Sequence, residues 1–212
     1  MKRYSAAFIL LIFIMWLLNS SSVFGIRSGY EQIKYSVIER IGDVEIRKYP
    51  FRIVAEVHDA KDDNEAFMLL FHYISGENSA NTNVAMTTPV QVDKASMKIP
   101  MTTPVETSTF SDSRVSMRFF LPSSLRLDSA PKPNDSRIKI LGLPEETFAV
   151  LTYSGSGSHE RFRSKSNELL NILSGSHWQP ILPPSFLGYD PPFTIPFLRR
   201  NEVIVKVEAS QR

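Results

Sequence analysis

Four segments of the sequence alternate apolar and polar residues with a period of two, and this pattern narrows the possible folds more than any other feature. They are DVEIRKY (43–49), FRIVAEVH (51–58), VSMRFFLP (115–122) and EVIVKV (202–207). Such alternation is typical of strands that bury one face. Weaker patterns at RIKIL (137–141) and TFAVLTY (147–153) bring the expected total to about eight strands.

Two other segments follow the helical period. The first, residues 62–76, places Ala66, Phe67, Leu70, Phe71 and Ile74 on one face, with Asp62 or Asp63 as N-cap and Gly76 as C-cap. The second, residues 158–175, carries a stripe of Phe162, Leu169, Leu170 and Leu173, with Ser158 as N-cap. Strands with two segregated helices predict an α+β fold. The similar helix endings LFHYISG and LLNILSG indicate two related halves.

The first 25 residues have the layout of a secretory signal peptide. Lys2 and Arg3 precede an apolar run at 6–18, and Val23 and Gly25 are small residues before the expected cleavage point. The run is shorter than the roughly 20 residues of a membrane-spanning helix, although a retained signal anchor stays open as an alternative. We therefore expect a single domain over 26–212 in the secretory pathway, extracellular or vacuolar, with no stable membrane span after cleavage.

Charge and composition exclude several classes of function. The chain has 24 Lys and Arg against 22 Asp and Glu, and residues 1–25 hold two of the basic ones and no acidic one, so 26–212 is balanced at 22 against 22. A neutral chain without basic runs argues against a nucleic-acid partner. The absence of cysteine excludes thiolate catalysis and iron–sulfur clusters. A sequon at Asn134 lies in a polar, proline-rich stretch that we expect to be exposed, and its occupancy stays open.

The histidines give no sign of a metal site or of catalysis. None of the four has the spacing of a zinc site, and His58 and His177 are expected on the surface. His72 follows Met68 by one helical turn, and both point away from the apolar stripe, so this face is either plain surface or the border of a ligand cleft. No nucleophile–base pair is visible along the chain, and we predict that the protein is not an enzyme.

Two motifs remain open in meaning. The pentapeptide MTTPV occurs at 86–90 and again at 101–105, which predicts two similar adjacent strands that bury Met86 and Met101 rather than a methionine ligand site. The C-terminal stretch GYDPPFTIPFLRR (188–200) sets apolar residues among three prolines before Arg199 and Arg200. It suits a flat hydrophobic ligand with carboxylates at its edge, but composition alone favours a packed loop with a solvated arginine pair.

Taken together, these motifs resemble the SOUL/heme-binding-protein family. The resemblance is carried by VEIRKYP (44–50), YISGEN (73–78), the doubled MTTPV, and GYDPPF with RRNEV (188–193 and 199–203). It extends over nearly all of 30–207, and the signal peptide is similar to that of plant-like members. The resemblance implies a distorted antiparallel β-barrel of about eight strands with two helices, in two pseudo-repeated halves.

It also implies non-covalent binding of heme or a related tetrapyrrole in an apolar surface cleft, as a carrier, buffer or scavenger. Carried over to this sequence, the cofactor-binding residues are Met68, His72, Tyr73, Lys98, Tyr189, Phe193, Arg199 and Arg200. The alternative is a protein-interaction or signalling module that uses the same barrel without a physiological tetrapyrrole. An enzyme acting on a tetrapyrrole is the least supported reading.

Axial ligation of the iron cannot be carried over in the same way. Lys48 stands where some family members have a histidine, and a protonated lysine is a poor ligand. Either His72 or a methionine serves as axial ligand, or the iron is held weakly and metal-free porphyrin binds equally well. We favour weak ligation.

Overall fold

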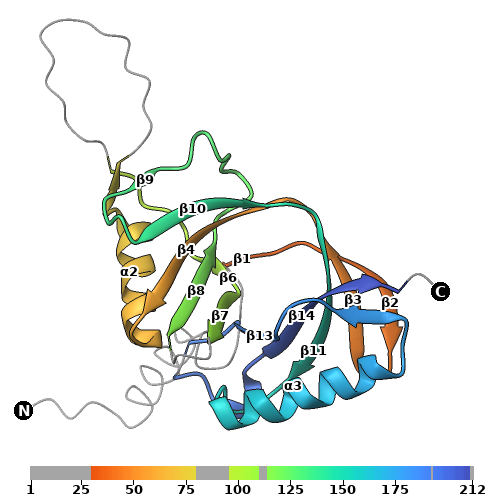
Figure 1. Ribbon diagram of the computed structural model, residues 1–212. Helices are drawn as coiled ribbons and strands as arrows, with labels where there is room; N and C mark the ends of the chain where they lie inside the picture. Colours follow the sequence, from red (N-terminus) through yellow and green to blue (C-terminus); the bar gives the residue numbers. More distant parts are fainter. Residues whose placement is uncertain (1–29, 80–95, 110–113, 192, 211–212) are drawn as a thin grey trace, which may run out of the picture.

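The computed structural model describes residues 30–79, 96–109, 114–191 and 193–210. Ten strands form its main sheet: β2 (Ser36–Ile41), β3 (Val44–Tyr49), β4 (Arg52–Ala60), β7 (Val105–Thr109), β8 (Val115–Phe120), β10 (Ile138–Leu143), β11 (Glu146–Tyr153), β12 (Trp178–Pro180), β13 (Ser185–Gly188) and β14 (Asn201–Ala209). The strand order is β10-β4-β8-β7-β13-β14-β11-β3-β2, with β12 also paired to β14. Every pairing in this sheet is antiparallel (Figure 1).

Two further sheets consist of short strands only. Strand β1 (Glu31–Gln32) runs parallel to β6 (Thr102–Thr103). Strand β5 (Asn78–Ser79) is antiparallel to β9 (Lys132–Pro133). Because β1 pairs with β6, the segment that begins at residue 30 crosses the end of the main sheet.

The two helices begin and end where the sequence predicts. Helix α2 spans Asp63–Ser75, its N-cap Asp62 accepts a hydrogen bond from the Glu65 backbone N–H at 2.8 Å, and Gly76 is its C-cap with φ +121°. Helix α3 spans His159–Ser174, with Ser158 as N-cap. A 3-10 turn, η1 (Pro196–Leu198), precedes β14.

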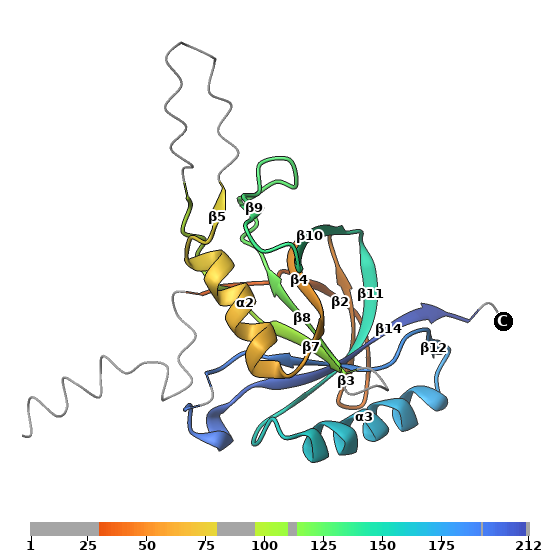
Figure 2. The same cartoon turned by 60° about the vertical axis from the view of Figure 1, so that its left-hand side comes forward.

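Both helices cover the same face of the main sheet. Helix α2 packs against β4 and β8, and α3 packs against β11, β12 and β14. Side chains of directly paired residues lie on the same face of a sheet. Met117 pairs with Thr107, Thr107 with Phe186, and Phe186 with Val203, so Met117 and Val203 lie on one face. Met117 lies in the core under α2 and Val203 in the core under α3. The opposite face therefore carries no helix from the described residues (Figures 1 and 2).

The sheet curls strongly toward its helix-free face. Arg52 on β4 donates a hydrogen bond to Glu146 on β11 at 2.7 Å, although four strands separate β4 and β11 in the strand order. The Arg52 guanidinium also lies 4.8 Å from the centroid of the Tyr49 ring on β3. These contacts require that the helix-free face forms the inside of the curl.

The predicted α+β class, with two helices and a large antiparallel sheet, is confirmed, but the predicted barrel is not closed. The outermost strands of the order, β10 and β2, do not pair with each other in the described part of the chain. The contacts across the curl are made by side chains such as Arg52 and Glu146 instead of a ladder of backbone hydrogen bonds.

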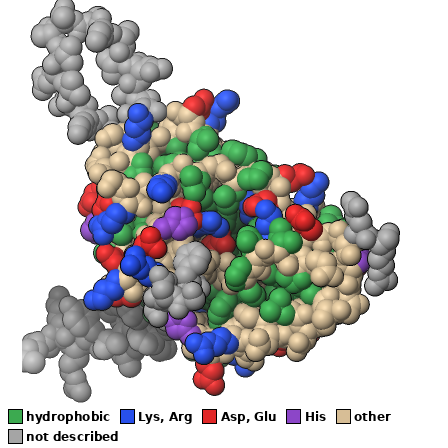
Figure 3. All heavy atoms as spheres, viewed as in Figure 1, with side chains coloured by type: hydrophobic (Ala, Val, Ile, Leu, Met, Phe, Trp, Pro, Cys, Tyr) green, Lys and Arg blue, Asp and Glu red, His purple; other side chains and the backbone are tan. Residues whose placement is uncertain are grey.

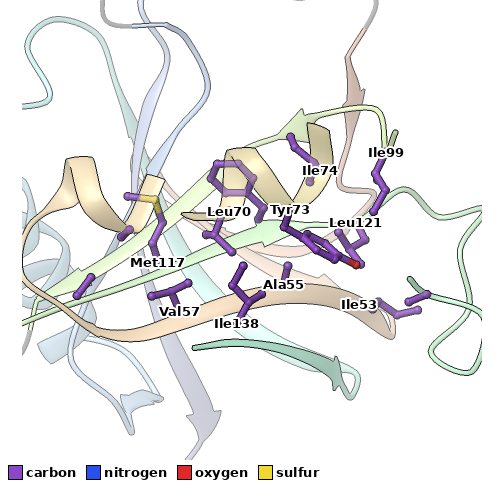
Figure 4. Close-up of a cluster of buried hydrophobic side chains, with 14 of the residues drawn as sticks. Ile53, Ala55, Val57, Leu70, Tyr73, Ile74, Ile99, Met117, Leu121 and Ile138 are labelled. Atoms are coloured by element: carbon purple, nitrogen blue, oxygen red, sulfur yellow. The ribbon is translucent and has the colours of Figure 1, made fainter. Parts of the chain in front are cut away.

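The apolar stripe of α2 is rotated relative to the prediction. Phe71 is exposed, whereas Tyr73 is fully buried and lies with Leu70 and Ile74 among the strand residues of the core (Figure 4). The hydroxyl group of Tyr73 donates to the carbonyl of Pro131 at 2.9 Å, which satisfies the one polar atom of a buried tyrosine. Phe71 instead stacks on Phe67, with 5.9 Å between ring centroids.

Several expectations fall partly outside the described residues. The expected signal peptide and the first MTTPV copy lie there, so a pairing between the two copies is not described. The second copy forms β6 and the start of β7, joined through a cis Thr103–Pro104 peptide. Asn134 is exposed, and its side-chain oxygen accepts from the Ser79 hydroxyl at 3.0 Å. Within the described residues, no helix is long and apolar enough to cross a membrane.

Candidate functional site

The predicted cofactor residues fall into two groups, and the C-terminal group is partly taken up by a buried ion network. Glu202 is fully buried. Its carboxylate accepts from the Tyr189 hydroxyl at 2.7 Å, from Arg200 Nη2 at 2.6 Å and from Arg47 Nη1 at 3.0 Å. The Arg200 guanidinium also lies 4.1 Å from the centroid of the Tyr189 ring. Tyr189 and Arg200 thus have protein partners, and their predicted role in binding a cofactor stays a prediction.

The ionisation of this network follows from its burial and its charges. Burial alone raises the pKa of Glu202, but the guanidinium groups of Arg47 and Arg200 outweigh it and hold that pKa below its ordinary value of 4.5. Burial, with the nearby Glu202 charge, raises the pKa of Tyr189 well above its ordinary value. The same two causes, burial first, raise the pKa of Tyr49 to about 12. Glu202 is therefore ionised and both tyrosines are neutral at pH 7.

The remaining C-terminal residues present an exposed apolar turn. Phe193 is 63% exposed and the neighbouring Phe197, in η1, is 70% exposed. Arg199 is half-buried, and its Nε donates to the carbonyl of Thr194 at 2.7 Å. The arginine therefore fixes the turn that holds the two phenylalanines outward.

The α2 group has the orientation that the sequence predicts, except for Tyr73. Met68 and His72 are exposed, and His72 Nδ1 lies 3.1 Å from Glu77 Oε1. Lys98 is exposed. It lies beside the C-terminal end of the helix, because the N–H of the next residue, Ile99, donates to the carbonyl of Ile74 at 2.8 Å. Tyr73 belongs to the core. Lys48 is exposed and paired with Glu145 at 2.7 Å.

A pocket of about 670 Å³ lies elsewhere, where the segment 31–34 crosses the end of the sheet. Three other stretches complete it: residues 50–53 around the β3–β4 turn, Thr102 of β6, and the end of β8 with the loop that follows it, within residues 120–128. Pockets of roughly 300–1,000 Å³ are the size that encloses a drug-sized ligand. None of the eight predicted cofactor residues lines it.

The walls of this pocket are mainly apolar, and its charged residues are mostly basic. The apolar lining residues are Ile33, Pro50, Phe51, Ile53, Phe120, Leu121, Pro122, Leu125 and Leu127. The cations are Lys34, Arg52 and Arg126, against Glu31 and Asp128. The Glu31 carboxylate accepts from the Ser123 N–H at 3.1 Å, which ties the segment 31–34 to the loop after β8.

Gly142 on β10 sets the position of one wall. A Cβ atom at this position would lie 2.7 Å from Phe51 Cζ and 3.5 Å from Leu127 Cδ2. The Phe51 ring therefore rests directly on the β10 backbone, beside Leu127. A side chain at position 142 would force the ring to move.

Sequence reasoning missed this pocket because its residues come from four separated segments without a common period. The nearest signal was the motif VEIRKYP, which ends at Pro50. Among the described residues that line the pocket, none is a histidine, methionine, cysteine or tyrosine. These are the residue types that ligate heme iron, so the residues present fit an apolar, carboxylate-bearing ring better than they fit an iron centre.

The surface in Figure 3 shows hydrophobic side chains in separate groups, with charged side chains between them. The described residues, including those of the pocket, contain no group of three or more histidine, aspartate or glutamate side chains that could hold a metal ion.

Comparisons with known proteins give one family and several structures of the same fold. The family model described as SOUL heme-binding protein matches residues 30–206. No curated protein matches the sequence. The crystal structure of the EcmrR C-terminal domain is 13% identical with a TM-score of 0.50, over 82% of this chain and 98% of that one. A structure titled as a hydrolase from Listeria innocua is 11% identical with a TM-score of 0.52, over 81% and 94%. At these identities, the likeness establishes the fold alone.

The Glu202 network predicts a large loss of stability in a conservative variant. Glu202→Gln leaves Arg47 and Arg200 without their buried counter-charge, and we expect the free energy of unfolding to fall by about 3 kcal/mol in urea denaturation at pH 7. Because the pKa of Glu202 is depressed in the folded state, its charge stabilises the fold above pH 4.5. This stabilisation is lost as the pH falls through the folded-state pKa of Glu202. The difference in the free energy of unfolding between variant and parent should therefore become smaller as the pH falls through that pKa.

Glu145→Gln is the matched control, because Glu145 makes a surface ion pair with Lys48. It should change the free energy of unfolding by less than about 1 kcal/mol. Equal effects of the two variants would contradict a structural role of the network.

Proposed function

Because this chain belongs to the SOUL heme-binding protein family, we propose that it binds heme or a related tetrapyrrole non-covalently, and that the pocket between residues 31–34, 50–53 and 120–128 is the site. The family description names binding and no reaction. The observation that supports this site is the pocket itself, about 670 Å³ of mainly apolar lining with three cations.

The energetics of such a site are favourable without any covalent bond. Burial of apolar area stabilises a complex by about 25 cal/mol per Å², and a few hundred Å² on the two faces of the ring suffices for micromolar binding after the cost of association. Lys34 and Arg126 are both exposed and suit the ring's carboxylates through charge-assisted hydrogen bonds. Lys34 has no ion pair within the described part of the chain.

The composition of the pocket also bears on the iron. Since its described lining residues include no common heme ligand, we infer that the metal adds little to the affinity. Heme and metal-free porphyrin should bind with similar strength. An axial role for His72 belongs to the competing site on α2, formed by Met68, His72 and Lys98.

We propose a role as a carrier, buffer or scavenger of the tetrapyrrole. Its location in the secretory pathway rests on the signal peptide expected at residues 1–25. The interaction module is the second candidate, and the exposed pair Phe193 and Phe197 favours it.

We also propose that the fold arose from two halves. The pairings β10·β4, β4·β8 and β8·β7 correspond to β3·β11, β11·β14 and β14·β13, with one helix on each set, which supports this view.

Titration of hemin, and separately of protoporphyrin IX, tests the pocket. We expect saturable one-to-one binding with similar dissociation constants, followed by the Soret band and by tryptophan fluorescence. Leu127→Asp places a charge on an apolar wall and should weaken both at least tenfold. Leu182→Asp is the control, because Leu182 is also an exposed leucine, at 56% against 49% for Leu127, and does not line the pocket. Unchanged binding in Leu127→Asp would reject the pocket as the site.

The same titration separates the pocket from the α2 surface. His72→Ala and Met68→Ala should leave the affinity for hemin within twofold of the parent, because neither residue lines the pocket. A loss of tenfold or more in His72→Ala, seen with hemin and absent with protoporphyrin IX, would instead assign the iron to His72.

The carboxylates of the ligand are tested by charge reversal and by salt. The double variant Lys34→Glu and Arg126→Glu should weaken protoporphyrin IX at least fivefold and leave its dimethyl ester nearly unchanged. The advantage of the acid over the ester in the parent protein should shrink as salt rises, since exposed charges are screened. Equal loss for acid and ester would contradict a role of these cations in binding carboxylates.

A further inference from the structure

We propose that Ser116, His58 and Glu56 form an acyl-transfer site, with Ser116 as nucleophile, His58 as general base and Glu56 as the group that orients the base. The three residues lie on the helix-free face, at the end of β4 that is remote from the pocket. His58 is five residues along the strand from Ile53, which lines the pocket, or about 17 Å at strand spacing. This inference is independent of tetrapyrrole binding.

The hydrogen-bonded chain has the arrangement that activates a serine. The hydroxyl oxygen of Ser116 lies 3.2 Å from His58 Nδ1, and His58 Nε2 lies 2.9 Å from Glu56 Oε1. A carboxylate at Nε2 favours the tautomer that carries its proton there, which leaves the Nδ1 lone pair free to accept the proton of the serine. A nucleophile within reach of a base that a third group orients is the general signature of this chemistry.

The carboxylate of Glu56 is buried and is held in place by Arg118. It is only 1% exposed. Its Oε1 also accepts a hydrogen bond from Arg118 Nε at 2.9 Å and lies 2.8 Å from Arg118 Nη2 in an ion pair. Its other oxygen, Oε2, is buried and has no hydrogen-bond partner among the described residues. The carboxylate thus holds the imidazole in one orientation, while Arg118 fixes the carboxylate.

Strand pairing brings these residues together. Glu56 and Arg118 are direct partners in the β4–β8 ladder, and His58 and Ser116 each lie two residues further toward the same end. The β4–β8 register shifts after Val57, where Asp59 has φ +59°. Because Ser116 and His58 are 58 residues apart and share no local motif, the sequence alone gave no sign of the pair.

The chemistry is hydrolysis of a carboxylic ester in two steps. Ser116 Oγ attacks the carbonyl carbon, its proton passes to His58 Nδ1, and the leaving alcohol takes that proton as its C–O bond breaks. Water then attacks the acyl-serine with the same proton transfers, which releases the carboxylic acid and restores the serine. Arg118 lies two residues from Ser116 on β8, and its side chain is 31% exposed.

Access limits the class of substrate. The His58 side chain is 43% exposed, whereas Ser116 is 5% exposed, so we expect a substrate to reach the nucleophile beside the exposed histidine. Arg118 is ion-paired with the Glu56 carboxylate. Its positive charge weakens the electrostatic stabilisation that Glu56 gives to the protonated imidazole of His58. Small, activated esters such as p-nitrophenyl acetate are therefore the expected substrates.

The test combines turnover with covalent labelling of the full chain. We expect hydrolysis of p-nitrophenyl acetate above the solvent rate, and a fluorophosphonate adduct that peptide mass mapping places on Ser116. Ser116→Ala and His58→Gln should each lower the enzyme-dependent rate at least tenfold, and Ser116→Ala should abolish the adduct. The labelling of the parent protein needs no variant, so it holds even where a substitution disturbs the fold.

Ser108→Ala is the matched control. Ser108 pairs with Ser116 across the β7–β8 ladder, and its hydroxyl is bonded to that of Ser185 at 2.9 Å instead of to a histidine. The control should retain the rate within twofold and still be labelled at Ser116. Absence of a Ser116 adduct, or an unchanged rate in Ser116→Ala, would overturn the proposal and reduce the cluster to hydrogen bonding of a buried glutamate.

Discussion

The buried carboxylate of Glu202 is the constraint on which the arrangement of the second half of the sheet depends. A fully buried charge is tolerated only where its hydrogen-bonding capacity and its counter-charges are supplied by the protein. Here Arg47 comes from β3, Tyr189 from the residue after β13, and Arg200 from the residue before β14. A shift of one residue in any of these strands would turn its side chain to the opposite face. The network therefore selects one register for the strands that it joins.

This network gives a physical reason for motifs that are far apart in the sequence. VEIRKYP contributes Arg47 and Tyr49, GYDPPF contributes Tyr189, and RRNEV contributes Arg200 and Glu202. From the sequence, Tyr189 and Arg200 were predicted to bind a ligand, because the same residue types bind carboxylates. In the structure both contact Glu202, and their role in binding a cofactor stays a prediction. Residue type alone does not distinguish a cation that binds a ligand from one that neutralises a buried glutamate.

The elements that could be predicted were those in which the local sequence decides the structure. Period-two alternation located β3, β4, β8 and β14, and the cap residues Asp62 and Ser158 fixed the starts of both helices. The buried face of α2 was predicted less well, because the choice between Phe71 and Tyr73 depends on tertiary contacts. Tyr73 finds a partner for its hydroxyl at Pro131, and Phe71 finds Phe67 on the same helix. Neither partner is visible in a helical period.

The candidate sites could not be predicted for a related reason, which lies in the curl of the sheet. Its helix-covered face is apolar and carries most of the core, while the helix-free face encloses charged residues such as Glu56, Arg47 and Glu202. The centre of that inner face is filled by Tyr49, Val150, Leu187, Tyr189 and Ile204. Solvent and ligands can therefore reach it chiefly near the ends of strands. The pocket lies where β4 begins and the Ser116–His58–Glu56 cluster lies toward its end, so both sites are set by how far the sheet curls, a property of all ten strands together.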